Sequence, residues 1–346
     1  MKIYSAILAS VITIVAILGA VFITKASSLS SPERYFQKGK RYYEMGNYDE
    51  AINNLNEYLS IETKLRPLEN VAQSYFLVAD SLKKQKKYHL AKERLTDIID
   101  NPEFISYSTN AIMVYADIAR LENAFDDYIT PKLQNNLRAK DKDIATTMNM
   151  EYGYQLFFQK KYGEALSYFL RANGELAVLG RARVYFSMND YDRAFEIYED
   201  FLQYYKTSIY YNEVMRTYLI QVPARAHRFF LDRNYTKARM KNNKIATLFP
   251  RTKYEEDALF RIGQSYYNEK NYDRAIEYYN RVRYNNVDTL DAEALLYIGL
   301  SYFKVGRYND SYKTLDSFVS QYPNNANVPR AKEYMAALQE TLLTLN

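Results

Sequence analysis

Few residues of this sequence have the types and spacing that catalysis or metal binding requires. The chain contains two histidines, His89 and His227, which lie far apart in the sequence, and it contains no cysteine. A metal site needs three or four convergent ligands, and an activated nucleophile needs a base within hydrogen-bond reach. Neither arrangement can be assembled from these residues, so we expect no metal site, no cofactor and no catalytic residue.

The glycines, carboxylates and lysines also lack the spacing of chemical sites. The ten glycines form no phosphate-binding loop, and neither an HExxH nor a GxxxxGK motif occurs. Asp49, Asp192 and Asp273 stand where turn formation and helix capping explain them. The densest basic run, KKQKK at residues 83–87, is predicted to be a solvated turn rather than a nucleic-acid or lipid site, since the net charge is only +5. We therefore predict that the protein is not an enzyme and does not bind nucleic acid.

A short phrase recurs along the chain and indicates its architecture. At residues 46–52 it reads GNYDEAI: a tight turn, a tyrosine and, three residues later, a small residue. The small residues of the seven copies are Ala51, Ala91, Ala165, Ala194, Ala238, Ala275 and Ser311. Twelve residues before each of these stands another small residue: Gly39, Ala79, Gly153, Ala182, Ala226, Gly263 and Gly299. Small side chains at paired positions are required where two helices cross at close range, so the pattern predicts repeated helix-turn-helix units.

The phrase resembles the tetratricopeptide repeat (TPR), a unit of about 34 residues made of helix A, a turn and helix B. In its numbering the small residues fill positions 8 and 20, and position 17 is Tyr in every copy. Pro250 and Pro323 stand at position 32, where the family ends helix B. The resemblance implies an all-α fold, a right-handed TPR α-solenoid of about eight helix-turn-helix repeats. Proteins of this family share binding rather than chemistry.

The N-terminal residues predict a membrane anchor. Residues 3–24 are apolar throughout, and no charge stands between Lys2 and Lys25. A helix of this length, at about 1.5 Å per residue, reaches about 33 Å, whereas the hydrocarbon core of a bilayer is about 30 Å thick. We therefore predict one N-terminal transmembrane helix, a signal anchor at residues 1–25. A cleaved signal peptide is the alternative, although no convincing cleavage site follows.

Beyond the anchor we predict three further segments. A polar linker spans residues 26–31, the TPR solenoid spans residues 32–326, and an amphipathic helix at residues 327–346 caps the stack. The interval between Ala91 and Ala165 is close to two repeat lengths, so a degenerate repeat is expected at about 106–145. Helix B of the copy around Ala165 is expected to be short, because Asn173 and Gly174 form a stop signal.

The resemblance places the binding surface on helix A, which lines the concave groove in this family. Position 12 is aromatic in six of seven repeats, and position 5 is apolar. The predicted partner-binding groove residues are Phe36, Tyr43, Phe76, Phe157, Phe186, Phe230, Phe260, Tyr267 and Phe303. Such rings could anchor a helix or an extended segment of another protein. They could equally pack between neighbouring A helices as consensus residues of the repeat, and the sequence leaves both interpretations open.

The carboxylate clamp of TPR chaperone cofactors is missing from this groove. Those cofactors have Lys at position 5 and Asn at position 9, whereas this chain is apolar at position 5 and has no Asn at position 9. We therefore do not expect recognition of a C-terminal carboxylate by that clamp.

The C-terminal third resembles TPR units of bacterial envelope proteins. The phrases FPRTKYEEDALFRIGQSYY at 249–267 and DAEALLYIGLSYFKVGRY at 291–308 are similar to those of the barrel-assembly lipoprotein and of the periplasmic coordinator of the Tol-Pal system. The lipid-bearing cysteine of the lipoprotein is absent. A membrane helix before a TPR body is also similar to the membrane-anchored TPR proteins of the spirochaete flagellar collar.

These resemblances imply a membrane-anchored scaffold or adaptor that docks other proteins in a bacterial envelope assembly. The main hypothesis is a periplasmic flagellar (motility) structure, with a single-pass anchor in the inner membrane; outer-membrane biogenesis or cell-division coordination is the alternative. Five basic residues soon after the apolar run favour instead a cytoplasm-facing adaptor: Lys25, Arg34, Lys38, Lys40 and Arg41. A short basic N-terminus is typical of exported proteins, and we predict the periplasmic orientation. Oligomeric assembly is left open.

Overall fold

The computed structural model describes residues 31–62, 66–284 and 287–345, and these residues are helical and free of strands. The predicted all-α fold of repeated helix-turn-helix units is confirmed for this part of the chain. The predicted transmembrane helix at residues 3–24 lies outside the described residues. No helix within the described part has the length and the apolar character that crossing a membrane demands. The described helices fall into two compact units: those up to residue 188 form unit 1, and those from residue 189 onward form unit 2.

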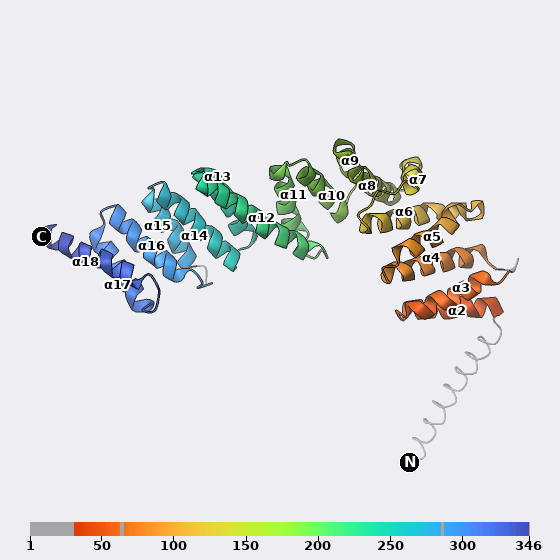
Figure 1. The fold of residues 1–346 in the computed structure, drawn as a ribbon, viewed down its shortest axis with the longest axis horizontal. Helices are drawn as coiled ribbons and strands as arrows, with labels where there is room; N and C mark the ends of the chain where they lie inside the picture. Colours follow the sequence, from red (N-terminus) through yellow and green to blue (C-terminus); the bar gives the residue numbers. More distant parts are fainter. Residues whose placement is uncertain (1–30, 63–65, 285–286, 346) are drawn as a thin grey trace, which may run out of the picture. The chain divides into compact units, whose positions relative to one another are not determined.

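Unit 1 stacks its helices as antiparallel pairs in sequence order (Figure 1). The pairs are α2 (Ser31–Glu44) with α3 (Tyr48–Ser60), α4 (Leu68–Lys84) with α5 (Tyr88–Ile99), α6 (Ile105–Leu121) with α7 (Ile129–Asn136), and α8 (Lys142–Phe158) with α9 (Tyr162–Phe169). A 3-10 turn at Pro102–Phe104 precedes α6, and α10 (Glu175–Ser187) follows α9. Helices α6 and α7 occupy the interval in which the degenerate repeat is predicted, and α9 ends at Phe169, before Gly174, whose φ is +90°.

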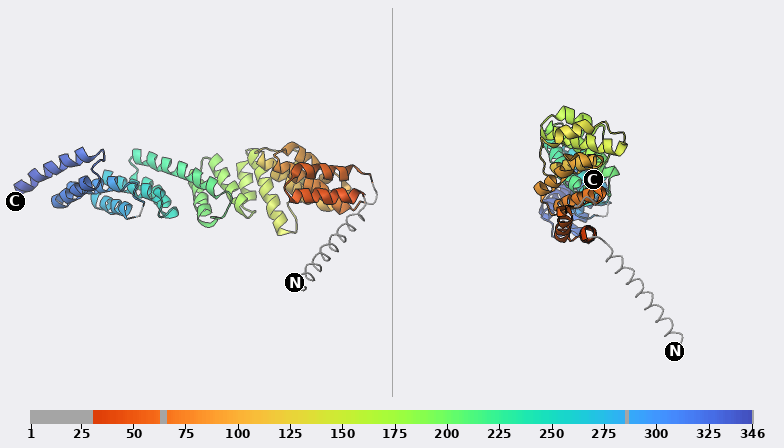
Figure 2. Two further views of the ribbon diagram at one scale, coloured as in Figure 1. Left: turned by 90° about the horizontal axis from the view of Figure 1, so that it is seen from below. Right: turned by 90° about the vertical axis from the view of Figure 1, so that its right-hand side faces the viewer.

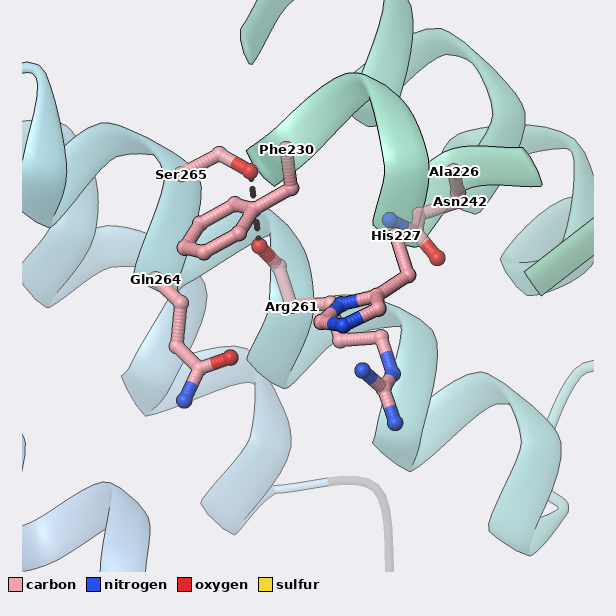
Figure 3. A pocket seen from close by; sticks show the side chains of 7 residues that line it. All are labelled: Ala226, His227, Phe230, Asn242, Arg261, Gln264 and Ser265. Carbon is pink, nitrogen blue, oxygen red and sulfur yellow. Dashed lines mark hydrogen bonds between the residues drawn. The ribbon is translucent and has the colours of Figure 1, made fainter. Parts of the chain in front are cut away.

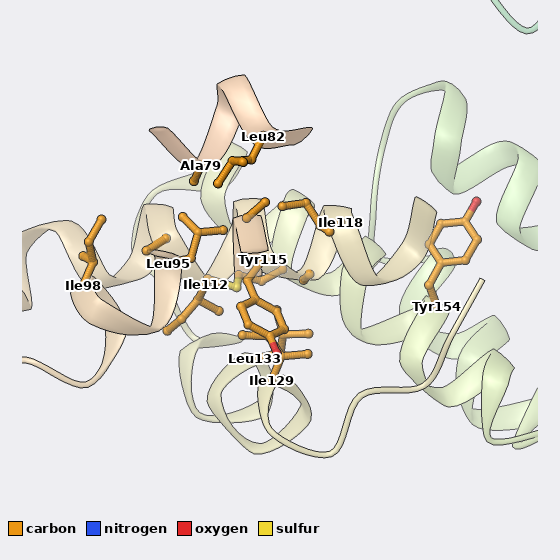
Figure 4. Close-up of a cluster of buried hydrophobic side chains, with 14 of the residues drawn as sticks. Ala79, Leu82, Leu95, Ile98, Ile112, Tyr115, Ile118, Ile129, Leu133 and Tyr154 are labelled. Atoms are coloured by element: carbon orange, nitrogen blue, oxygen red, sulfur yellow. The ribbon is translucent and has the colours of Figure 1, made fainter. Parts of the chain in front are cut away.

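The core of unit 1 runs continuously between these pairs. Around the degenerate repeat, apolar side chains of α6 pack against α5 on one side and against α7 on the other (Figure 4). The residues in this part of the cluster are Leu95, Ile98, Ile112, Tyr115, Ile118, Ile129 and Leu133. Helices α6 and α7 are therefore joined to the neighbouring helices by one continuous apolar cluster.

Unit 2 contains eight described helices. They are α11 (Tyr191–Tyr204), α12 (Tyr211–Leu231), α13 (Tyr235–Leu248), α14 (Lys253–Asn268), α15 (Tyr272–Arg283), α16 (Asp291–Lys304), α17 (Tyr308–Gln321) and α18 (Val328–Leu345). Successive helices pack on one another, and the blue helices of this unit can be followed in the left view of Figure 2. The terminal helix α18 buries Ala331 and Leu338 against the α16–α17 pair.

The turn between helix A and helix B has the same backbone in all seven copies. Its position 15 has a positive φ in each of them: Gly46, Lys86, Lys160, Asn189, Arg233, Lys270 and Gly306. In the turn before α15, the N–H of Lys270 donates to the Tyr267 carbonyl at 3.0 Å and the N–H of Asn271 to the Tyr266 carbonyl at 2.9 Å. These two bonds form a Schellman motif that satisfies the last carbonyls of helix A. Five of the seven copies adopt this conformation without glycine, at a steric cost.

The small residues stand at close helix contacts, as predicted. A Cβ on Gly263 would lie 2.6 Å from the ring of Tyr279, and a Cβ on Gly299 would lie 2.7 Å from the Leu315 side chain. In both repeats the glycine at position 8 meets a large residue at position 24 of helix B. Position 24 therefore fills the space between the two helices.

Candidate functional site

Most of the nine predicted groove rings have a partner inside the protein. Five rings at position 12 contact the tyrosine that opens the following helix B. The centroid distances are 6.0 Å for Tyr43–Tyr48, 5.6 Å for Phe157–Tyr162, 5.5 Å for Phe230–Tyr235, 5.3 Å for Tyr267–Tyr272 and 6.0 Å for Phe303–Tyr308. Since each pair spans the turn, these rings help to hold helix A against helix B.

The remaining four rings lie at different depths. Phe36 and Phe260 are buried, with ring centroids 5.4 Å from those of Tyr58 and Tyr279 respectively. Phe76 is half-buried against the core of unit 1, and Phe186 is half-buried on α10. The packing interpretation therefore describes Phe36 and Phe260 well. That any of the nine contacts a partner stays a prediction.

A pocket in unit 2 is lined by side chains of α12, α13 and α14 (Figure 3). It is lined by Ala226, His227, Phe230, Asn242, Arg261, Gln264 and Ser265. Its volume of about 60 Å³ exceeds the roughly 10–15 Å³ that one water needs, so it has room for a single side chain. Of the nine predicted groove residues, only Phe230 lines this pocket.

The pocket exists because of the residue at position 24. Where Leu55, Phe169 and Tyr279 fill the space between helices in other repeats, this repeat has Asn242, opposite Ala226. Asn242 is only 3% exposed, and its Nδ2 donates to the Ala238 carbonyl at 3.0 Å. Its Oδ1 is buried without a hydrogen-bond partner within the described structure. An unmatched buried acceptor is costly, so Asn242 makes this repeat less well packed than its neighbours.

The rim of the pocket is polar and positively charged. The guanidinium of Arg261 donates from Nε to Asp257 at 2.7 Å, and Ser265 donates to the Arg261 carbonyl at 2.9 Å, as the dashed line in Figure 3 shows. The exposed imidazole of His227 lies next to Phe230, with ring centroids 6.3 Å apart and planes inclined by 12°. The pocket thus offers an apolar wall and a cationic rim.

One exposed face of α12 leads to this pocket. Arg216, Ile220, Ala224, His227 and Leu231 are all exposed, and their spacing of four, four, three and four residues places them on one side of the helix. We call this set the α12 stripe. Ile220 and Leu231 remain 62% and 65% exposed, although both are large aliphatic residues. Exposed aliphatic residues beside a pocket are typical of a contact surface.

Arg261 and Asn242 line the pocket but are not among the residues predicted from the sequence. Arg261 stands at position 6, which the groove prediction did not consider, and Asn242 belongs to helix B. A signal for Asn242 was nevertheless present, because a short polar residue replaces the leucine or aromatic residue that most other copies have at position 24. Within the described residues, no group of three or more His, Asp or Glu is placed to hold a metal ion.

Unit 1 contains a second polar cluster, on its A helices. Asp117 of α6 pairs with both Lys83 of α4 and Arg120, and Arg120 Nε lies 3.5 Å from Oε1 of Glu151 on α8. Glu151 is 1% exposed, and burial raises its pKa to about 8 although Arg120 opposes the shift. Because the cluster joins three successive repeats and is closed to solvent at Glu151, we assign it a structural role.

Comparison with known families identifies the repeats. Residues 176–208, 257–288 and 293–325 match one tetratricopeptide repeat model, and residues 32–64 match a second. Each of these four segments is similar to a tetratricopeptide repeat, and together they make up less than half of the chain. They coincide with α10–α11, α14–α15, α16–α17 and α2–α3, so the TPR resemblance is confirmed at the level of the repeat. TPR segments generally form protein-interaction scaffolds rather than catalytic centres.

Several solved TPR structures are similar to the chain. A tetratricopeptide repeat protein from Parabacteroides merdae is 15% identical, with 78% of this chain and 98% of that chain covered and a TM-score of 0.42. The TPR2AB domain of yeast Sti1, in a complex with an HSP90 peptide, is 12% identical, with 89% and 98% covered and a TM-score of 0.32. The TPR domain of P58(IPK) is 14% identical, with 92% and 99% covered and a TM-score of 0.33. A comparison with curated proteins gave no match.

Proposed function

We propose that this protein is a TPR scaffold that captures a protein partner on its A helices, with the pocket between α12 and α14 as the principal contact. The observation that carries the proposal is the α12 stripe beside the pocket. It combines exposed aliphatic residues with the cationic rim of the pocket. Such a combination resembles the centre of a protein interface, where apolar anchors are surrounded by polar groups.

The proposal also includes the location of the scaffold. The apolar run at residues 3–24 would tether it to a bacterial inner membrane, and the TPR body would stand in the periplasm as part of a flagellar structure. This part is supported by the length of the apolar run and by the order of anchor and repeats. Outer-membrane biogenesis, cell-division coordination and a cytoplasm-facing adaptor remain the alternatives. A C-terminal reporter fusion that is active on the cytoplasmic side alone would overturn the periplasmic assignment.

Site-specific crosslinking in cells tests the capture of a partner. A photoreactive amino acid at Leu231 is expected to give a discrete protein adduct, because this side chain projects from the α12 stripe. The matched control places the same amino acid at Lys313, an exposed residue of α17 on a helix B. Adducts at Lys313 with none at Leu231 would show that the partner binds elsewhere and would overturn the proposed contact.

A further inference from the structure

Positive charge is concentrated in one segment of unit 2. Residues 214–253, which include most of α12 and all of α13, contain ten lysines and arginines and a single carboxylate, Asp232. The segment therefore carries +9 in a chain whose total is +5, so the rest of the chain is net negative. A local excess of this size attracts an oppositely charged partner and accelerates its association.

Three of the four positive charges on α13 form ion pairs inside the unit, and the fourth, Lys237, lies over the ring of Phe229. Arg239 pairs with Glu269, Lys241 with Asp192 at 2.6 Å, and Lys244 with Glu199 at 3.0 Å. These contacts tie α13 to helices α14 and α11 of the same unit. The charges of Arg239, Lys241 and Lys244 are therefore structural and are not available to a partner.

The positive charges on the exposed side of α12 are not neutralised. Arg216 and Arg228 are exposed, and neither forms an ion pair with any residue that the structure describes. Arg216 begins the α12 stripe, and Arg228 lies one residue beyond His227 at the pocket. Arg261 shares its charge with Asp257 through Nε alone, which leaves the outer nitrogens of the guanidinium for another carboxylate.

We propose that the α12 stripe and its pocket bind an acidic amphipathic segment of the partner protein. One aliphatic side chain of the segment enters the pocket between Ala226 and Phe230. Flanking aspartates or glutamates face Arg216, Arg228 and Arg261. The inference rests on the proposed scaffold function and adds the chemistry of the partner.

A nucleic acid fits this surface less well than an acidic peptide. Ile220 and Leu231 interrupt the arginines along α12 and would lie against phosphates, which gain nothing from aliphatic contacts. Phe230 is engaged with Tyr235, so its ring is not a free platform for base stacking. An amphipathic peptide satisfies the aliphatic and the cationic groups together.

Selection from a random peptide display library against the full-length chain in neutral detergent tests the proposal. We expect enrichment of sequences with aspartate or glutamate on both sides of Leu, Ile, Val or Met. Selected peptides are then resynthesised, and their dissociation constants are measured by fluorescence anisotropy at low and high salt. Arg216→Glu with Arg228→Glu is expected to weaken binding about tenfold at low salt, because two surface charge pairs become repulsive. Affinity should fall with salt for the parent and much less for the double variant.

Two further variants separate the contributions of charge and of aliphatic contact. Leu231→Ser should weaken binding at every salt concentration, whereas Lys313→Glu, a charge reversal on α17, should leave it unchanged. Circular dichroism spectra of the variants should match the spectrum of the parent, because the substituted residues are exposed. Enrichment of basic or uncharged peptides, or no enrichment at all, would overturn the proposal. Binding of an oligothymidylate that requires Arg216 and Arg228 but is insensitive to Leu231→Ser would assign the surface to nucleic acid instead.

The outcomes distinguish this inference from the scaffold proposal. A partner crosslinked at Leu231 through a segment without acidic residues would retain the scaffold and overturn the acidic specificity. An absence of adducts at Leu231, with adducts elsewhere, would overturn both.

Discussion

Replacing Glu151 by glutamine isolates the effect of burying one carboxyl group. Glu151 lies on α8, is 1% exposed, and has both carboxyl oxygens without a hydrogen bond among the described residues. Burial raises its pKa from 4.5 to about 8, because the ionised form loses its hydration. The folded protein therefore binds this proton more tightly than the unfolded chain does. The stability that this proton binding provides is fully present below about pH 4.5 and is lost as the pH rises through about 8.

The expected magnitude follows from the size of the shift. Each pKa unit corresponds to about 1.4 kcal/mol, so the wild type should lose roughly 3 kcal/mol relative to Glu151→Gln between about pH 5 and pH 8. Near pH 5 the two proteins should be similarly stable, since a protonated carboxyl and an amide are nearly isosteric and both uncharged. Arg120 keeps Asp117 as its partner in the variant.

Urea unfolding followed by circular dichroism at the two pH values measures this difference. Repeat proteins can unfold in segments, so hydrogen exchange of the α8 amides provides a local reading in the same samples. Glu57→Gln, an exposed substitution on α3 of the same unit, is the matched control and should show no such pH dependence. A variant that is less stable than the wild type at pH 8 would show that Glu151 is ionised and stabilised by Arg120, and would refute the reasoning.

Three further predictions concern the repeat itself and are read from the urea midpoint. Gly263→Ala should lower the free energy of unfolding by about 1–3 kcal/mol, because the added Cβ would lie 2.6 Å from the buried Tyr279 ring. An unchanged urea midpoint would mean that this ring moves freely. Lys270→Gly should raise the free energy of unfolding by up to about 1 kcal/mol, because φ is +65° at this position and a residue with a Cβ is strained there. A lower urea midpoint would show that the backbone at Lys270 is not strained. Asn271→Ala should cost about 1 kcal/mol by removing the side-chain cap of α15, whereas Lys161→Asn should supply the cap that α9 lacks and raise the midpoint.

The features that could be predicted from the sequence are those that every repeat must satisfy. Even a Cβ at Gly39, Gly263 or Gly299 would lie 2.5–2.7 Å from a side chain of helix B, so small residues recur at this position and can be recognised without a structure. The helix boundaries follow for the same reason, because the turn ends helix A at a fixed distance from these contacts.

The pocket could not be predicted in the same way, because it arises where one repeat has a different residue, Asn242, at position 24. Asn242 is shorter than the residues that the other copies have at position 24. The space that it leaves becomes a pocket because Arg261 and Gln264 of the next A helix line its other side. Their proximity depends on how neighbouring repeats are stacked, which no single repeat specifies. The cluster at Glu151 escaped prediction for the same reason, since its charges come from three different helices.

The position of a ring in the groove does not by itself make it available to a partner. Tyr267 stands at position 12 as predicted, yet it contacts Tyr272 at 5.3 Å and Tyr297 at 5.6 Å, so its removal would first disturb the repeat. Ile220 and Leu231 gain little from the fold, because most of their surface remains in water. Burying such residues in an interface gains roughly 25 cal/mol per Å² without a loss of internal packing. The apolar contribution to binding is therefore expected from the aliphatic residues of the α12 stripe more than from the aromatic residues that first suggested a groove.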